Sequence, residues 1–268
     1  MLYKHIKLDR ADFKVQYFSN IYDFTTYLDQ SKVSNIFKCE DLSSQDYGSW
    51  HGTNTYNEAQ ELLSHGWLPE ASALSKKLPI SSTLSPASKR TNIYSVAGFQ
   101  ASVPRYLQGV PTNMISQRKS VQKQKVVVLN RSIVFSASWS AKKIEEEGIK
   151  ALQVVKALEG NGFRVKLNVM TVHTIGYGKT ESAVAVICVK KPDEPLNLSK
   201  IAFPIAHPAM LRRLAFKWLE NFQEITNRSF TSGYGSARED LYKNIMPKGE
   251  HLMPSEIGDV EKYIKTLI

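Results

Sequence analysis

A lysine in a glycine-rich loop is the first feature of this sequence that could do chemistry. Residues 176–180, GYGKT, read like the end of a phosphate-binding loop, in which a lysine and backbone N–H groups hold phosphates. The complete motif needs a glycine where this chain has His173, and a helix where the sequence predicts a strand. We therefore predict a hairpin loop, in which Lys179 could touch a phosphate only as a point charge.

A second short motif joins Ser140 to Lys143 as Ser-x-x-Lys, the nucleophile pair of some acyl-transfer enzymes. The companion motifs of those enzymes are absent from the sequence. Ser140 also precedes a predicted helix, where a serine hydroxyl accepts a hydrogen bond from a free N–H group of the first turn. We therefore predict that Ser140 caps this helix.

The serines of the same turn alternate along the chain at Ser136, Ser138 and Ser140. The elements predicted around them, over residues 126–222, follow the order strand, helix, strand, strand, helix, which resembles the von Willebrand factor A-type fold. The metal site of that fold needs Asp-x-Ser-x-Ser, and this chain has serine in place of the aspartate. Since hard divalent cations prefer carboxylate ligands, we predict no metal site, and the resemblance informs the fold alone.

The cysteines and histidines also lack the spacing of a metal or catalytic site. Cys39 and Cys188 are far apart in the sequence and have no CxxC partner, so two structural thiols are expected. The six histidines show no ligand spacing, and each is expected in the core or on the surface: His5, His51, His65, His173, His207 and His251. We predict no cofactor and no catalytic residue, and hence a protein that is not an enzyme.

The net charge of +10 is concentrated in one segment of the 268-residue chain. Residues 71–144 contain 12 lysines and arginines and no acidic residue, whereas residues 1–70 carry a net charge of −4 and residues 145–268 a net charge of +2. An acid-free segment suits a surface that binds a polyanion, most simply nucleic acid. The alternative is a solvated basic face without a partner.

Aromatic residues are interleaved with these cations at Tyr94, Phe99, Tyr106 and Trp139. Cations that follow a phosphate backbone, with rings on which bases stack, are typical of proteins that bind single-stranded nucleic acid. The sequence has no zinc-finger, helix-turn-helix or RNP signature, so it predicts no sequence-specific recognition. The predicted contact residues are Lys89, Arg90, Arg105, Arg118, Lys119, Lys123, Lys125, Tyr94 and Tyr106.

The α/β core that must position this segment begins at residue 126. Residues 126–135 are apolar and β-branched, as in a buried central strand. Residues 140–160 show the apolar period of a helix and residues 163–172 alternate like a strand, which predicts a crossover between parallel strands. Residues 183–191 predict another strand, antiparallel at an edge of the sheet. The apolar face of the helix is formed by Ile144, Gly148, Ala151, Val155 and Leu158.

Flanking elements are marked by their end signals. Thr55 and Glu58 form a capping box before a helix that Gly66 ends. Pro208, a favoured residue of the first turn, opens the second of two helices that follow the last core strand. A strand is expected over residues 13–18, a helix with aromatic residues follows it, and a short helix is expected over residues 255–268.

Together these elements predict an α/β three-layer sandwich with a mixed sheet. A hydrophobic fraction of 42% suffices for one large or two small cores, and the absence of a signal peptide or an apolar span favours a soluble protein without a membrane contact. The predicted divisions are residues 1–70, an N-terminal α+β extension; 71–125, a basic acid-free loop region packed on the core; 126–226, the α/β core; and 227–268, a C-terminal tail with a terminal helix.

Three stretches of the chain, residues 52–67, 96–114 and 207–220, resemble a family of uncharacterised proteins encoded by tailed bacteriophages. The chain is also similar in size and charge to the single-stranded-DNA-binding transcription accessory protein of podoviruses with a two-subunit RNA polymerase. That resemblance implies single-stranded DNA and a phage RNA polymerase or replication protein as partners, and the host cytoplasm as the location.

We therefore expect a non-enzymatic, phage-encoded accessory factor that binds single-stranded DNA and recruits or assists a viral transcription or replication enzyme. The region beyond Asn227 is the expected docking site for that enzyme. The alternative, from another class of protein, is a protein-interaction or virion-associated module on a metal-free von Willebrand A-like fold.

Overall fold

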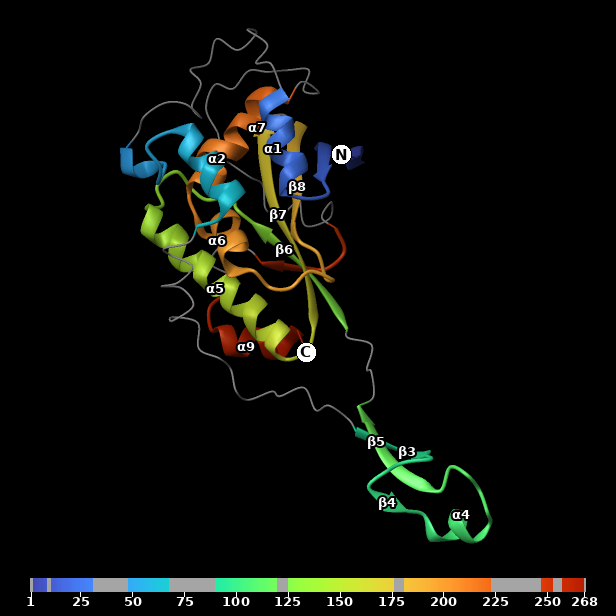
Figure 1. Ribbon diagram of the computed structural model, residues 1–268. Coiled ribbons are helices and arrows are strands. Elements are labelled where there is room, and N and C mark those ends of the chain that lie inside the picture. The colour runs from blue at the N-terminus through green and yellow to red at the C-terminus, as the bar shows by residue number, and fades with distance from the viewer. Residues whose placement is uncertain are drawn as a thin grey trace.

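The chain folds into a mixed α/β structure with two separate sheets (Figure 1). This computed structural model describes residues 2–8, 11–30, 48–67, 90–119, 125–175, 181–222, 247–252 and 257–267. One sheet has six strands in the order β1-β2-β8-β7-β6-β9, and the other has three in the order β3-β5-β4. The strands are β1 Leu2–Leu8, β2 Ala11–Phe18, β3 Arg90–Ser95, β4 Gln100–Ala101, β5 Met114–Lys119, β6 Val126–Ser132, β7 Arg164–Ile175, β8 Glu181–Lys190 and β9 Glu250–Leu252.

Helices cover one face of the six-stranded sheet, as Figure 1 shows for α2, α5 and α6. Apolar residues of helices and strands share one buried cluster on this face, including Val155, Leu167 and Phe203. The predicted α/β sandwich with a mixed sheet is therefore confirmed. The helical segments are α1 Ile21–Gln30, the 3-10 turn η1 Gly48–Trp50, α2 Tyr56–His65, α4 Val103–Leu107, α5 Ala141–Gly160, α6 Leu198–Ala206, the π-helical segment η2 Met210–Ala215, α7 Phe216–Asn221 and α9 Val260–Leu267.

Strand β6 lies inside the large sheet, as its apolar sequence predicts. It pairs in parallel with β7 on one side and with β9 on the other. Neighbouring strands cover both of its edges, and Leu129 and Asn130 are fully buried. The chain passes from β6 through α5 to the parallel strand β7, so the predicted crossover unit is confirmed.

Helix α5 is formed and placed by signals that the sequence displays. The hydroxyl of Ser140 accepts a hydrogen bond from the backbone N–H of Lys143 at 3.3 Å, which confirms its role as helix cap. The predicted apolar face is buried against the sheet and α6. At Gly148 the two helices meet closely, because an added Cβ would lie 2.3 Å from the Cα of Ala206.

The N-terminal strands extend the same sheet and do not form a separate one. Strand β2 pairs in parallel with β8, and β1 pairs antiparallel with β2. Strand β8 is antiparallel to β7, as predicted, but the prediction that it lies at an edge is wrong. Local sequence could not show this, because the strand that covers the edge of β8 lies about 170 residues earlier in the chain.

Helix α2 carries the predicted caps at both ends. The Thr55 hydroxyl accepts a hydrogen bond from the N–H of Glu58 at 3.1 Å, and the Glu58 carboxylate accepts one from the N–H of Asn54 at 2.8 Å. The return bond therefore reaches one residue further back than in a standard capping box. Gly66 ends the helix at φ 93°, a backbone conformation that favours glycine.

The opposite face of the large sheet carries a smaller apolar cluster. Its buried members come from strands or follow them directly, among them Val15, Val134, Val172 and Val184. The part of the chain that the structure describes places no helix residue in this cluster. The third layer that the sequence predicts is thus not seen within the described ranges.

The helical segments η2 and α7 follow α6, and two arginines of η2 form hydrogen bonds to loops that are distant in the sequence. The predicted helix from Pro208 is confirmed, and its first part has π-helical geometry. The buried guanidinium of Arg212 donates hydrogen bonds to the carbonyls of Trp50 at 2.6 Å and Trp139 at 2.8 Å. The adjacent Arg213 donates to the hydroxyl and the carbonyl of Thr53, each at 2.8 Å. The basic residues of this segment are therefore structural, since they tie the loop before α2 to the core.

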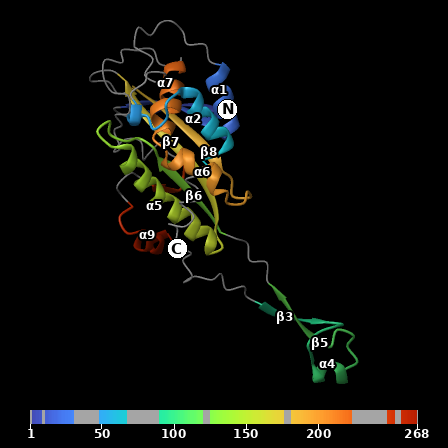
Figure 2. The same ribbon diagram turned by 60° about the vertical axis from the view of Figure 1, so that its left-hand side comes forward.

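Residues 90–119 form the three-stranded sheet and α4, apart from the helices of the larger body in both views (Figure 2). We predicted a loop packed on the core here. The structure instead has three strands, and the side chains of Phe99, Tyr106 and Leu107 are exposed. The chain brings the aromatic residues together on a small sheet of their own, where the sequence offers too few apolar residues to bury them.

Several predictions fall on other parts of the chain. The terminal helix is confirmed as α9, which packs beside α5. The loop GYGKT, Cys39 and residues 227–246 lie outside the described residues. Along the chain, β6, α5, β7, β8 and α6 follow the element order on which the von Willebrand A-type resemblance rests, and that resemblance stays a prediction. Within the described ranges, no helix is long and apolar enough to cross a bilayer.

Candidate nucleic-acid interface

The predicted contact surface centres on β5, the middle strand of the three-stranded sheet. Strand β3 pairs with it over its whole length, with Tyr94 opposite Ile115, and β4 pairs with its first two residues. The chain between β3 and β4 approaches β5 closely, because the N–H of Phe99 donates to the carbonyl of Ile115 at 3.0 Å. A Cβ at Gly98 would lie 2.1 Å from the same carbonyl oxygen, so only glycine fits there.

The rings of this small sheet face solvent. Tyr94, Phe99 and Tyr106 are 54%, 62% and 67% exposed, respectively. From residue 92 to residue 118 every side chain is exposed or half-buried, so these rings do not form a core. Three aliphatic side chains add to the exposed apolar area: Val96, Val103 and Leu107. Large exposed apolar patches on a protein commonly mark sites of interaction with another molecule.

Arg105 is held against one of these rings. Its guanidinium carbon lies 4.3 Å from the ring centroid of Tyr94. The same guanidinium donates to the carbonyl of Thr112 at 3.1 Å and to its hydroxyl at 3.2 Å. Arg105 therefore fixes α4 and the Tyr94 ring relative to each other, and its charge stays at the surface of the small sheet.

Of the other predicted cations, three lie on β3 and β5: Arg90, Arg118 and Lys119. The strand register sets Arg90 opposite Lys119 and Thr91 opposite Arg118. Arg118 is exposed. Lys125 is also exposed, at the start of β6, with its Nζ 5.9 Å from the ring centroid of Phe163. The remaining two, Lys89 and Lys123, lie outside the described residues.

Three further cations of the acid-free segment belong to the large body: Arg131, Lys142 and Lys143. Arg131 is fully buried and donates from Nη1 to the carbonyl of Leu252 in β9 at 3.3 Å. Lys143 lies with its Nζ 3.9 Å from the ring centroid of Trp139, at the start of α5. The segment is therefore divided: Arg131 lies in the core of the large body, Lys142 and Lys143 are exposed on α5, and the small sheet with α4 carries Arg90, Arg105, Arg118 and Lys119.

A cationic sheet with exposed rings can bind a flexible polyanion. Arginine and lysine side chains neutralise phosphates, and a ring exposed beside them offers a face on which a base can stack. No acidic residue occurs between residues 71 and 144, so nothing within this segment repels a phosphate. Within the described residues, no cluster of three histidine, cysteine or acidic side chains is suited to a metal ion.

Comparison with known protein families gives one match. A family model described as Domain of unknown function (DUF7192) matches residues 8–264. The chain belongs to this family. The match begins in β1 and ends in α9, so it covers both sheets of this DUF7192 protein. Neither the curated proteins nor the solved structures contain a match to it.

The buried titratable groups of the DUF7192 chain serve the fold. Burial lowers the pKa of His173 to about 3 and that of His207 to about 4, so both rings are neutral at pH 7. The ring of His173 accepts or donates one hydrogen bond with the Thr171 hydroxyl at 2.7 Å, and that of His207 stacks on Phe203. Burial also lowers the pKa of Arg212 to about 10, which leaves it charged.

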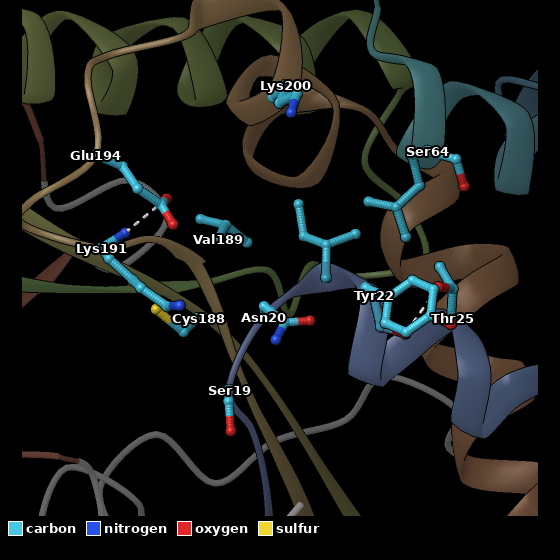
Figure 3. A pocket seen from close by; sticks show the side chains of 12 residues that line it. Ser19, Asn20, Tyr22, Thr25, Ser64, Cys188, Val189, Lys191, Glu194 and Lys200 are labelled. Atoms are coloured by element: carbon cyan, nitrogen blue, oxygen red, sulfur yellow. Dashed lines mark hydrogen bonds between the residues drawn. The ribbon is translucent and has the colours of Figure 1, made fainter.

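Two hollows on the large body of the DUF7192 chain were not predicted from the sequence. The one in Figure 3, of about 320 Å³, lies beside the start of α1 and is lined by Asn20, Tyr22, Lys191 and Lys200, among others. The other, of about 720 Å³, is lined by Lys4, Lys166 and Lys191. The three lysines of the second hollow come from segments that lie far apart in the sequence, so no local pattern reveals it.

Proposed function

We propose that this DUF7192 protein is a non-enzymatic factor that binds single-stranded DNA through the three-stranded sheet. Phosphates contact the cations at and beside β3 and β5, and bases stack on Tyr94, Phe99 and Tyr106. The binding is independent of base sequence, because stacking and phosphate contacts are available from every nucleotide.

The exposure of the three rings on an acid-free sheet carries this proposal. Rings that serve only the fold are normally buried, as Phe18 and Phe24 are in the large body. On the small sheet the rings stay in solvent beside Arg105 and Arg118. Exposed rings and uncompensated cations together are the combination that single-strand binding needs.

The bacteriophage resemblance supplies the wider role within this proposal. The protein acts in the host cytoplasm, where it recruits or assists a viral RNA polymerase or replication enzyme at exposed single strands. The small sheet holds the DNA, and the C-terminal region beyond Asn227 holds the enzyme. Deletion of residues 227–246, which keeps β9 and α9 in place, then abolishes capture of that enzyme from infected cells but leaves DNA binding intact, whereas unchanged capture removes this role from those residues.

The salt dependence of DNA binding tests the proposal. The affinity is measured by fluorescence anisotropy of a labelled single strand at salt concentrations from about 25 to about 300 mM. We expect the logarithm of the binding constant to fall with the logarithm of the salt concentration, with a slope of about −0.7 per neutralised phosphate. A slope of about −3 corresponds to four or five contacts. If no oligonucleotide binds even at the lowest salt concentration, the proposal is wrong.

A second candidate function is protein interaction, which the exposed aliphatic side chains of Val96, Val103 and Leu107 favour. In that case the small sheet docks on an apolar protein surface, and the chain serves as an interaction or virion-associated module. Apolar docking depends weakly on salt, whereas phosphate binding depends on it steeply. The same titration therefore distinguishes the two functions.

A further inference from the structure

The larger hollow lies on the six-stranded sheet and contains no residue of the acid-free segment. Its volume of about 720 Å³ is within the range of small-molecule sites, roughly 300–1,000 Å³. The hollow forms where β1 begins and where β2 and β8 end, and β7 also lines it, so four strands of the sheet contribute to its walls. It is thus a concavity built by the fold itself.

The strand register explains why this hollow is polar. On the face that carries the smaller apolar cluster, Val15 pairs with Val184, and the next pair on the same face is Tyr17 with Val186. One step further, Cys188 pairs with Asn168. The face therefore changes from buried valines to side chains with hydroxyl, thiol and amide groups, and the hollow opens at this change.

Three lysines from separate elements line the hollow: Lys4 of β1, Lys166 of β7 and Lys191 after β8. Asp193 is its one acidic lining residue among those described. By contrast, the more deeply buried lysines of the same sheet are matched to acids: Lys14 bonds to Glu181 at 2.5 Å and Lys190 to Glu159 at 2.7 Å. None of the ion pairs between described residues includes a lysine of the hollow.

We propose that this hollow is a phosphate-binding site. Lysine ammonium groups bind phosphates as point charges, and these three come from separate segments to one hollow, which scattered surface lysines do not. The Nζ of Lys4 lies 5.4 Å from the ring centroid of Tyr17, which holds this ammonium at the rim. The hydroxyls of Tyr17 and Ser19 add neutral donors to the wall.

Cys188 provides a reporter inside the site. Its thiol is partly buried in the wall, and it also lines the neighbouring hollow in Figure 3, where it lies beside Lys191. Burial raises the pKa of this thiol, while the charges of Lys166 and Lys191 act to lower it. A bound phosphate covers the sulfur and offsets these charges, so it slows alkylation of the thiolate.

The experiment measures the rate of iodoacetamide alkylation of the full-length Cys39→Ser protein, which retains Cys188. Inorganic pyrophosphate, ADP, adenosine and a single strand with or without a 5′-phosphate are added separately at increasing concentrations. We expect saturable protection of at least about fivefold by a phosphate-bearing probe and none by adenosine. Protection by pyrophosphate or ADP assigns the site to a free phosphate compound, and protection only by the 5′-phosphorylated strand assigns it to a strand end.

Substitution of the lysines tests the assignment to this hollow. Lys166→Ala with Lys191→Ala weakens binding of the protecting probe about 100-fold, since a hydrogen bond to a charged group is worth about tenfold or more. The matched control is Lys262→Ala with Lys265→Ala on the exposed face of α9, which leaves binding unchanged. Calorimetric titration gives the affinities without reliance on the thiol.

The proposal is overturned if no phosphate-bearing probe protects Cys188, or if adenosine protects it equally. It is also overturned if the variant with both lysine substitutions binds the probe as tightly as the control does. Equal protection by strands with and without the 5′-phosphate would assign the hollow to the DNA backbone and would remove it as a separate site. The proposed DNA-binding function stands or falls independently, because its contact residues lie on the small sheet.

Discussion

In the six-stranded sheet, Lys14 is buried and bonded to Glu181, and Arg131 is enclosed in the core with a backbone carbonyl as partner. In the three-stranded sheet, Arg118 is exposed, and the rings of Phe99 and Tyr106 are exposed with it. The large sheet thus uses Lys14 and Arg131 within the fold, while the small sheet presents Arg118 and its rings to solvent. Both sheets belong to one chain that is rich in lysine and arginine. The number of these residues therefore does not locate a binding surface, whereas the exposure of their side chains does.

Charge reversal on the small sheet and its exit strand has the largest expected effect. Replacement of Arg118, Lys119, Lys123 and Lys125 by glutamate converts four attractive phosphate contacts into repulsive ones, so affinity for single-stranded DNA falls by more than about 1,000-fold at low salt. The fold is expected to persist, because Arg118 and Lys125 are exposed. Anisotropy measures the affinity, and circular dichroism with thermal melting monitors the fold.

The matched control reverses four exposed lysines of the large body: Lys7, Lys248, Lys262 and Lys265. It makes the same change in net charge, so it separates a local contact from a general electrostatic effect. We expect a loss of less than about tenfold. Equal losses in the two variants would contradict the contrast between the sheets.

A steric change in the large body has the next largest effect, and it acts on stability alone. Gly148→Ala places a Cβ 2.3 Å from the Cα of Ala206, so α5 and α6 must separate, at a cost of about 3 kcal/mol in unfolding free energy. Gly160→Ala in the same helix meets nothing within 4 Å and is expected to change stability by less than about 1 kcal/mol. Guanidinium titration compares the two. Equal stability of the two variants would show that the helices do not pack as described.

The third prediction concerns pH, which acts on the two sheets differently. With pKa values of about 3 and about 4, His173 and His207 stay neutral in the folded protein at pH 5, whereas in the unfolded chain their pKa is about 6.5. The unfolded state therefore binds more protons below about pH 6.5. Stability is highest above that pH and falls by about 2 kcal/mol per histidine between pH 7 and pH 5.

Denaturant titrations at pH 7, 6 and 5 measure this loss, and His173→Gln removes about half of it. Residues 90–119 contain no histidine and no acidic residue, so DNA affinity stays constant between pH 7 and pH 6. Stability that does not change with pH would contradict the burial of the two rings. A DNA affinity that falls together with the free energy of unfolding would show that the small sheet binds DNA only while the large body is folded.

The smallest expected effect comes from a single ring. Phe99→Ala removes one stacking platform and weakens single-strand binding by about tenfold, equivalent to about 1.4 kcal/mol. Because Phe99 is exposed, the melting temperature is expected to stay within about 2 °C. The control is Tyr22→Ala on α1, an aromatic residue that is 76% exposed on the large body and leaves binding unchanged. A greater effect of Tyr22→Ala than of Phe99→Ala would place the DNA on the wrong sheet.

Sequence reasoning succeeded where a signal is local. Helix α5 follows from a cap at Ser140 and an apolar period, and the pair β6 and β7 follows from two strands around it. Long-range pairing was not predictable. The addition of β2 to β8 brings together residues about 170 positions apart, and no turn or period encodes that contact. The same limit hid the hollow formed by Lys4, Lys166 and Lys191.

The candidate interface was predicted in part. The sequence indicated an acid-free segment and the rings of Tyr94 and Tyr106, but Arg131, one of the 12 cations of that segment, is buried in the structure. The strands β3 and β5 were missed because polar and apolar residues alternate only weakly along them. They are therefore recognised from their pairing and not from their pattern. The rings are exposed because β3, β4 and β5 pair into a sheet of their own. Their exposure could therefore be seen only in the structure.

The most direct test of the central claim is a map of the DNA contact. A single strand that contains 5-iododeoxyuridine is crosslinked by ultraviolet light to the full-length protein, and the modified residues are identified by mass spectrometry. We predict crosslinks at Tyr94, Phe99 and Tyr106, which disappear at high salt. Crosslinks confined to exposed rings of the large body, such as Tyr3 and Tyr22, would contradict the assignment of DNA binding to the three-stranded sheet.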